Sequence, residues 1–181
     1  VYSNVVIKKP WCHEYLAYGN SEVAVWVLYI KPGFRTSMHC HPGKKTSIVV
    51  LEGEAQFSTL INKFNLKMGS GFLLDRGVFH STASLSNEGI TVLETETPTN
   101  KKNLVRLFDM YGREGRGYES GENYMQPREA TYAAFHDEYD RYDLEKLIGQ
   151  CALRIVKLGN VTDFKNKLQS IQAHIMAVLK G

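Results

Sequence analysis

The sequence predicts a mainly β protein: a small antiparallel barrel or sandwich followed by a C-terminal helical extension. Three observations support this fold class. Short runs of β-branched and aromatic residues recur between residues 23 and 97. Turn sequences rich in glycine, proline, asparagine and serine separate these runs. After about residue 142, the apolar residues change to helical spacing. Short strands at such intervals are typical of antiparallel sandwiches and barrels.

The elements follow from these patterns in chain order. Residues 1 to about 22 form an N-terminal segment that contains Lys-Pro-Trp-Cys-His-Glu-Tyr. Strands are expected over residues 23–30, 36–41, 47–51, 55–60, 71–74, 78–83 and 90–96, with turns at 31–33, 41–43, 52–53, 69–71 and 86–89. We therefore expect residues 22–97 to form two antiparallel sheets, with helix confined largely to residues beyond 130. A barrel of this size encloses side chains or one small ligand.

Residues 114–181 are expected to form a second region, after a barrel region over residues 1–113. Six of the ten tyrosines fall between Tyr111 and Tyr142, among glycines and charged residues. Such a stretch has few aliphatic residues for a core of its own, so it is expected to wrap the barrel, form a lid or pack on a second subunit. Helical spacing then predicts two helices, capped by Asp143 and Asp163. The apolar residues that carry this spacing are Leu144, Leu147, Ile148 and Cys151 in one helix and Phe164, Leu168, Ile171 and Ile175 in the other.

Three of the six histidines lie in strand-like runs and are candidate metal ligands. His39 and His41 stand one residue apart, so their side chains leave the same face of a strand. His80 lies in a second such run, Val-Phe-His-Ser-Thr. Imidazoles on a rigid strand are suitable ligands for a divalent metal ion such as Zn, Mn, Fe or Ni. The other histidines, His13, His136 and His174, are expected to be ordinary core or surface residues.

The spacing of these residues resembles the cupin superfamily, whose fold is a double-stranded β-helix or jelly-roll barrel. Gly33, His39, His41 and Gly53 match the first cupin motif. The second motif is matched by Gly69, Gly77 and His80, with Asp75 where proline is usual. The residue at the place of the motif glutamate is Thr46, whose hydroxyl is a poor metal ligand. The resemblance therefore leaves three alternatives: a three-histidine site, a site completed by another carboxylate, or a site that has lost its metal.

A second resemblance concerns residues 9 to 113. The stretch from Leu104 to Arg113 resembles the Val-Arg-Phe-Glu-Asp-x-Tyr-Gly-Arg ending of the cupin domain in phosphomannose isomerase/mannose-1-phosphate guanylyltransferases, and Pro10-Trp11 resembles its Pro-Trp-Gly element. That family holds its metal with a Gln/His/Glu/His set. Carried over, these positions are His39, His41, Thr46 and His80, so two of the four are altered. The resemblance implies a sugar-phosphate or nucleotide-sugar substrate.

Charged residues beside the motifs are candidates for binding substrate and moving protons. Glu94 and Glu96 share one face of a strand, so if that face is interior, either one can complete the metal site or act as a general base. Thr46 is a candidate contact for a metal-bound water. The candidates for binding an anionic substrate are Lys44, Lys45, Arg76 and Arg106. The alternatives are that the lysines and glutamates are solvated and that Arg106 pairs with a nearby carboxylate.

The overall composition restricts the partners. A net charge of +3 in 181 residues, with no long basic run, gives no support for nucleic-acid binding. No apolar run is long enough to span a membrane. Three cysteines without a Cys-x-x-Cys pair indicate a reducing, cytoplasmic location. We expect a homodimer, because the tyrosine-rich stretch needs a surface to bury against.

Three functions from different classes remain open at this level. The first is an isomerase or epimerase that acts on a phosphorylated sugar. The second is a three-histidine non-haem iron dioxygenase, which the threonine at position 46 favours. The third is a non-catalytic sugar-binding cupin. The final residues, His-Ile-Met-Ala-Val-Leu-Lys-Gly, resemble part of the first motif and can instead be a strand that begins a second cupin repeat.

Overall fold

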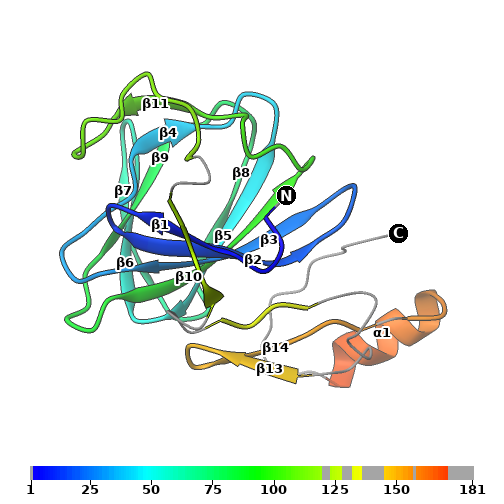
Figure 1. The fold of residues 1–181 in the computed structure, drawn as a ribbon. Helices are drawn as coiled ribbons and strands as arrows, with labels where there is room; N and C mark the ends of the chain where they lie inside the picture. The colour runs from blue at the N-terminus through cyan, green and yellow to red at the C-terminus, as the bar shows by residue number, and fades with distance from the viewer. Residues whose placement is uncertain (1, 120–122, 128–131, 136–144, 157, 171–181) are drawn as a thin grey trace.

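Two antiparallel sheets face each other and enclose the main hydrophobic core (Figure 1). The computed structural model of the chain describes residues 2–119, 123–127, 132–135, 145–156 and 158–170. The larger sheet consists, in spatial order, of Tyr124–Met125 (β12), Val6–Lys9 (β1), Cys12–Gly19 (β2), Ala24–Ile30 (β3), Ile90–Thr97 (β10), Lys45–Glu52 (β5) and Gly71–Leu74 (β8). The smaller sheet consists of Val105–Phe108 (β11), Met38–Cys40 (β4), His80–Ser84 (β9), Glu54–Thr59 (β6) and Lys63–Lys67 (β7).

The expectation of an antiparallel barrel over residues 22–97 is confirmed. Each of the seven runs predicted from the sequence contains a strand, and every strand pair in the two sheets is antiparallel. The sheets also recruit residues outside that range. The N-terminal segment supplies β1 and β2, and β11 and β12 join from beyond residue 97. Polar residues that point inward, such as Glu14, interrupt the apolar alternation of β2 and so weaken its strand signal.

The two faces of the larger sheet have different coverings. On β10, Ile90 and Val92 belong to the core between the two sheets, and Glu94 and Glu96 continue the same face. On the opposite face, a second core cluster forms around Val27, Val49 and Leu51 and includes Ile148. Because both faces are covered, the central strand β3, Ala-Val-Trp-Val-Leu-Tyr-Ile, is a continuous apolar run.

The predicted helix around Leu147 and Ile148 is wrong in the part that the structure describes. Glu145–Ile148 (β13) and Cys151–Arg154 (β14) form an antiparallel hairpin, in which Ile148 pairs with Cys151 across a two-residue loop. Gly149 in this loop has a φ of 60°, a conformation that glycine adopts without strain and that two-residue hairpin loops require. Leu144 and Asp143 lie outside the described residues.

A short helix, Val161–Ser170 (α1), follows this hairpin, as the sequence predicts for the region beyond residue 130. Its N-cap is Asn160, whose side-chain oxygen accepts a hydrogen bond of 2.9 Å from the backbone N–H of Asp163. The predicted cap, Asp163, is instead the third residue of the helix, and its carboxylate accepts a hydrogen bond of 3.2 Å from the N–H of Gly159, the residue before the N-cap. The predicted helical residues Ile171 and Ile175, and the predicted terminal strand, lie outside the described residues.

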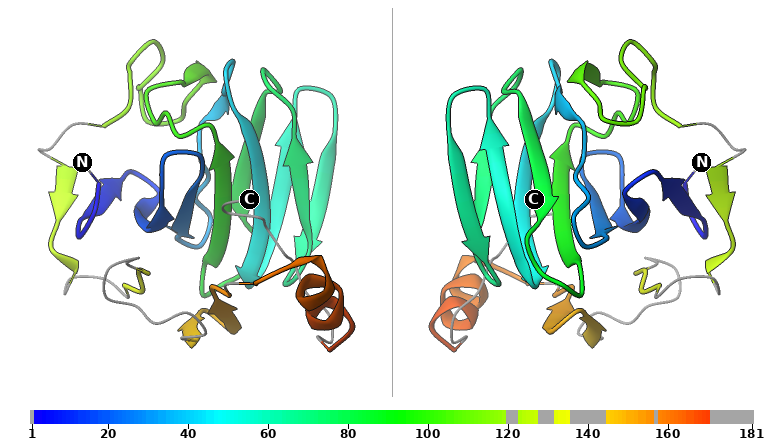
Figure 2. Two further views of the ribbon diagram at one scale, coloured as in Figure 1. Left: turned by 90° about the vertical axis from the view of Figure 1, so that its right-hand side faces the viewer. Right: turned by 90° about the vertical axis from the view of Figure 1, so that its left-hand side faces the viewer.

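The hairpin and α1 lie on one side of the barrel, and β11 lies on the opposite side (Figure 2). Four tyrosines of the tyrosine-rich stretch contact the barrel. Tyr111 donates a hydrogen bond to the Arg35 carbonyl oxygen and Tyr118 donates one to Glu14, while Tyr124 and Tyr132 pack against the two core clusters. Among the described residues, α1 is much too short to cross a lipid bilayer, and no other helix is long and apolar enough to do so.

Candidate metal centre

Three histidines meet on the inner face of the smaller sheet. His39 on β4 stands directly opposite His80 on β9 in the strand register. His41 follows β4 two residues after His39, so its side chain leaves the same face. The strand pairing therefore brings together two histidines separated by one residue and a third that is distant from them in the sequence.

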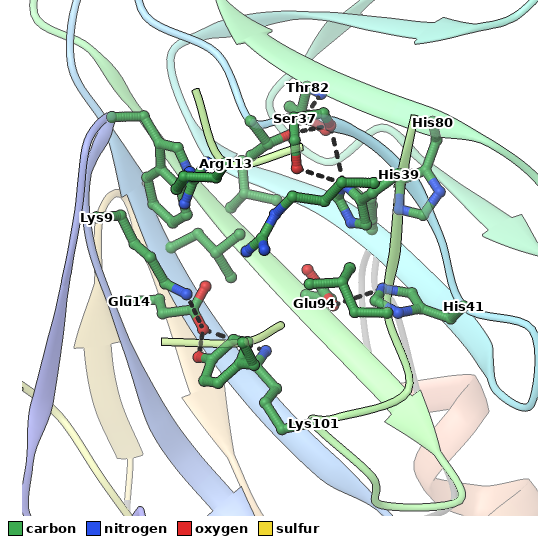
Figure 3. Close-up of a pocket in the computed structure, with 18 residues that line it drawn as sticks. Lys9, Glu14, Ser37, His39, His41, His80, Thr82, Glu94, Lys101 and Arg113 are labelled. Carbon is green, nitrogen blue, oxygen red and sulfur yellow. Dashed lines mark hydrogen bonds and ion pairs between the residues drawn. The ribbon is translucent and has the colours of Figure 1, made fainter. Parts of the chain in front are cut away.

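The three imidazoles are close enough to share one ion. One ring nitrogen from each residue lies within 4.8 Å of the other two. The ring centroid of His39 is 4.5 Å from that of His80 and 5.0 Å from that of His41. In Figure 3 the three rings gather on one side of the pocket, with Glu94 facing His41. The structure brings His39, His41 and His80 together, as the sequence predicts.

Hydrogen bonds orient all three rings in the same way. The Nδ1 atoms of His39, His41 and His80 lie 2.8, 2.7 and 2.9 Å from the backbone carbonyl oxygens of Ser37, Asn103 and Val78, respectively. A carbonyl oxygen accepts, so each Nδ1 carries a proton and each Nε2 carries the lone pair. The Nε2 atoms of His41 and His80 are buried and have no hydrogen-bond partner in the described part of the chain.

The surroundings keep these rings neutral. Burial lowers the pKa of His39 well below its usual value, and His80 and His41 beside it lower it further. Burial, with Lys44 nearby, lowers the pKa of His41 to about 3. Burial also lowers the pKa of His80, against the effect of its backbone hydrogen bond and of Glu94. Neutral imidazole is the form that binds metal ions.

The residues present therefore fit a divalent metal ion. Buried nitrogens that have lone pairs but no donor nearby cost free energy unless something binds them. A histidine that binds a metal ion through one ring nitrogen usually donates a hydrogen bond from the other ring nitrogen, for example to a backbone carbonyl oxygen. Imidazole ligands suit Zn, Fe and Ni, and carboxylate oxygens suit Mn. The donor set thus agrees with one divalent ion from the range predicted from the sequence.

Glu94 is the carboxylate that lies beside this group. It is buried, and its Oε1 atom is 3.9 Å from Nε2 of His41. Among the described residues this is its one contact within 4 Å with a basic side chain. It reaches the cavity from β10 in the facing sheet, whereas the motif glutamate would come from the position of Thr46. Glu94 is thus placed either to complete the donor set or to accept a proton.

A small cavity extends from the histidines toward the N-terminal strands. It is partly open to solvent, and its volume is about 50 Å³. Apolar residues such as Leu28, Ile48 and Val92 line part of the wall. The ionisable and phenolic residues of the opposite wall are Lys9, Glu14, Lys101, Arg106, Arg113 and Tyr118. The cavity therefore joins a neutral nitrogen-rich end to a densely charged end (Figure 3).

Glu14 organises the charged end. Nζ of Lys101 lies 3.2 Å and Nζ of Lys9 3.5 Å from its carboxylate, and Tyr118 donates a hydrogen bond to it. Burial alone would raise the pKa of Glu14, but Lys101 and Lys9 outweigh burial, so the pKa falls to about 2. Lys101 also lies over the indole ring of Trp26, 3.8 Å from its centroid. The group is held rigidly by complementary charges.

The arginines at this end are anchored by acidic residues that follow β11. Arg113 makes a bidentate ion pair with Asp109, with distances of 3.0 and 2.7 Å. The remaining terminal nitrogen of Arg113 donates a hydrogen bond of 2.5 Å to Glu119. Arg106 donates a second hydrogen bond, of 3.3 Å, to the same carboxylate. The short Asp109–Glu119 segment thereby closes the cavity wall.

The structure disperses the other predicted site residues. Lys44 is buried and forms an ion pair with Glu96, which also accepts a hydrogen bond of 3.1 Å from Trp26 Nε1. Thr46 is buried opposite Glu96 in the strand register and does not line the cavity. Lys44 and Glu96 thus satisfy each other rather than facing a ligand, whereas the buried Thr46 hydroxyl has no hydrogen-bond partner among the described residues.

Lys45 and Arg76 lie on the outside of the barrel. Lys45 is about half exposed and contacts the exposed Asp75 at 3.2 Å. Arg76 is exposed, and neither residue lines the cavity. Of the four residues predicted to bind an anion, Arg106 alone lines it.

Sequence reasoning missed Lys9, Glu14, Lys101 and Tyr118. These residues come from segments far apart in the chain, and none stands in a motif. It also missed Asn103, whose carbonyl oxygen accepts the His41 hydrogen bond and whose side chain accepts one of 2.7 Å from the N–H of Gly43. The one available signal was the Pro-Trp element next to Lys9.

Comparison with solved structures shows the fold. The oxalate decarboxylase formate complex from Lactobacillus farciminis superposes with a TM-score of 0.51 and 14% identity, over 56% of this chain and 33% of that one. KdgF from Halomonas sp. has a TM-score of 0.49 and 15% identity, over 51% of this chain and 84% of that one. An RmlC-like cupin from Shewanella frigidimarina has a TM-score of 0.49 and 18% identity, over 54% and 85%.

The barrel has the double-stranded β-helix fold that the sequence predicts. No protein-family model matches the chain, and no curated protein matches its sequence. The narrower resemblance to phosphomannose isomerase/mannose-1-phosphate guanylyltransferases stays a prediction.

Proposed function

We propose that this protein is a metal-dependent cupin enzyme that acts on a small anionic sugar derivative. His39, His41 and His80 hold one divalent metal ion, and Glu94 moves a proton. The observation that carries this proposal is the set of three neutral imidazoles whose Nδ1 atoms face carbonyl oxygens and whose ring nitrogens converge. A sugar phosphate is the substrate that the sequence resemblance favours.

Each part of the cavity has a role in this reaction. A divalent ion bound by the histidines would supply Lewis-acid polarisation of a carbonyl or hydroxyl group. Glu94 is the buried carboxylate next to the ligands, so it accepts the substrate proton and returns it to a neighbouring atom in an isomerisation or epimerisation. The charged end of the cavity orients the anionic group of the substrate. The apolar wall excludes water and strengthens these interactions.

The first test is metal content. Protein purified without added metal should contain close to one divalent metal ion per chain, as measured by inductively coupled plasma mass spectrometry. His41→Ala and His80→Ala should lose most of it and keep the fold, whereas the matched control His13→Ala should retain it, because His13 does not line the cavity. A wild-type protein that binds none of Zn, Mn, Fe or Ni would contradict the proposal.

The second test separates binding from proton transfer. Glu94→Gln should keep its metal and lower kcat by at least a hundredfold with little change in KM, because general-base catalysis contributes about 10²–10⁴-fold. Sugar phosphates should raise the melting temperature of the metal-loaded protein. If no member of a sugar-phosphate and nucleotide-sugar panel does so, the substrate class is wrong.

A three-histidine iron dioxygenase is the second candidate. The observation that favours it is the neutral three-nitrogen set with a threonine at the usual glutamate position. Tightly bound iron, together with oxygen uptake on a thiol or diketone substrate, would favour this function over the isomerase.

We also infer that the protein is a cytoplasmic homodimer. All three cysteines are free, which agrees with a reducing compartment. Strand β11 is an edge of the smaller sheet, and Val105, Leu107 and Phe108 on it are exposed. Light scattering at micromolar concentration should give twice the chain mass, and a monomer would contradict the inference.

A further inference from the structure

Arg106 lies beside the metal centre because of strand pairing. In the register of β11 and β4, Arg106 is the direct partner of His39, so the two side chains leave the same face of the sheet. Both residues line the cavity, and the Arg106 side chain is only 3% exposed. A guanidinium group is therefore fixed next to one of the candidate ligands.

The guanidinium is anchored by two of its three nitrogens. One terminal nitrogen donates to the carbonyl oxygens of Arg116 and Gly117, both at 2.7 Å, and the other donates to Glu119 at 3.3 Å. The Nε atom is buried and has no partner among the described residues. Buried donors without an acceptor are rare and costly, so this N–H requires an explanation.

The balance of charge around the cavity indicates what fills this position. Lys9, Lys101, Arg106 and Arg113 supply four positive charges, and Glu14 and Glu94 in the lining, with Asp109 and Glu119 against the arginines, supply four negative ones. Lys44 and Glu96 cancel each other. A divalent ion held by the three ring nitrogens would add two positive charges, and Glu94, whose carboxylate lies 3.9 Å from His41, would offset only one of them. An anionic ligand restores the balance in this poorly solvated space.

We propose that Arg106 is a substrate-binding residue that recognises an oxyanion group bound at the metal centre, with Nε–H of Arg106 donating to one of its oxygens. This inference rests on the proposed function and names the recognition element of the same site. The oxyanion is a carboxylate or a phosphate, because both present an oxygen for the ion and another for the arginine. The lysines are less suited, because Glu14 already pairs with both.

The test measures anion binding to metal-loaded protein at constant ionic strength. Acetate and inorganic phosphate are titrated separately by calorimetry into wild type, Arg106→Gln, Arg106→Lys and the control Arg154→Gln. Arg154 is an exposed residue of β14, on the opposite side of the barrel. We expect Arg106→Gln to lower the affinity for the tighter-binding anion at least tenfold. Arg106→Lys should lower that affinity severalfold, because it keeps the charge but lacks Nε. Arg154→Gln should bind the anion as wild type does. The better anion identifies the oxyanion as carboxylate or phosphate.

A direct readout follows the Arg106 side chain in the wild-type protein, with the conservative Arg106→Lys variant used only to assign its resonance. In wild-type protein labelled with ¹⁵N-arginine, the Nε–H resonance that Arg106→Lys lacks should shift when the anion is added. Circular dichroism and metal analysis accompany every variant. Wild-type protein that takes up no metal would overturn the proposed function. Metal-loaded protein whose anion affinity is unchanged in Arg106→Gln, or whose Arg106 resonance does not move, would overturn this inference and leave the metal site standing.

Discussion

Replacing Lys44 with methionine tests whether Lys44 is buried in an ion pair while its neighbour Lys45 is exposed. Lys44 and Glu96 form an ion pair in which each side chain is 1% exposed. Methionine keeps much of the lysine volume and removes the charge. Removing one partner of a buried ion pair destabilises a protein by roughly 3–5 kcal/mol, because the remaining charge has no compensation.

Proton uptake sets an upper limit on this cost. A stranded glutamate can become neutral, which at pH 7 costs about 1.36 kcal/mol for each pH unit above an unperturbed value of about 4.3, or about 3.7 kcal/mol in total. The folded variant then binds a proton that its unfolded chain does not, so its stability rises as the pH falls. The deficit relative to wild type should shrink to about 1 kcal/mol at pH 5.

Urea unfolding at pH 7 and pH 5 measures both values. The matched control is Lys45→Met, because Lys45 is the adjacent lysine, half exposed and paired with the exposed Asp75. Its change should stay within about 0.5 kcal/mol at both pH values. The double variant Lys44→Met/Glu96→Gln should recover most of the loss and keep the acceptor for Trp26. Equal destabilisation by the two single lysine variants would refute the buried ion pair.

Two further predictions concern a buried carboxylate of the cavity wall and a glycine in a turn of the barrel. Glu14→Gln should cost about 3 kcal/mol at neutral pH, since the carboxyl pKa falls from 4.5 to about 2 on folding. Because that pKa is lowered, the stabilisation is present above pH 4.5 and is lost as the pH falls toward 2, so the urea midpoints of wild type and variant should converge in acid; a constant difference would contradict this. Gly53→Ala should destabilise strongly, because a Cβ would lie 2.7 Å from the carbonyl oxygen of Gly89. Gly77→Ala shares a positive φ but meets nothing within 4 Å, so thermal unfolding should show a loss of only about 1–2 kcal/mol.

The barrel and the three histidines could be predicted because their signals are local. Turn glycines and short apolar runs mark strands without knowledge of what packs against them. The alternation of side chains along a strand places His39 and His41 on one face. His80 was a candidate from its own strand-like run, but only the motif resemblance placed it beside the other two, because its pairing with β4 joins positions far apart in the chain.

The charged end could not be predicted for the opposite reason. Glu14 contacts Lys9, Lys101 and Tyr118 only after three distant segments have packed together. Lysine is normally exposed, so the sequence gives no indication that Lys44 is buried. Its burial depends on the ion pair with Glu96, which lies on a distant strand. The same local reasoning failed at the hairpin of β13 and β14, where the loop conformation of Gly149 outweighed an apolar spacing that also suits a helix.

The energetics of the histidine group separate a working metal site from a relic of one. Two buried Nε2 atoms without partners cost about 1–3 kcal/mol each, and no interaction among the described residues offsets that cost. A barrel that no longer bound metal would be stabilised by apolar side chains at these positions. A bound ion instead stabilises the folded state by RT ln(1 + [metal]/Kd), about 4.1 kcal/mol at a thousandfold excess over Kd. Metal addition should therefore raise the melting temperature of the wild type, whereas the melting temperature of His80→Ala should not change. If removal of metal from the wild type leaves its melting temperature the same, the unpaired nitrogens are a cost that no ligand offsets.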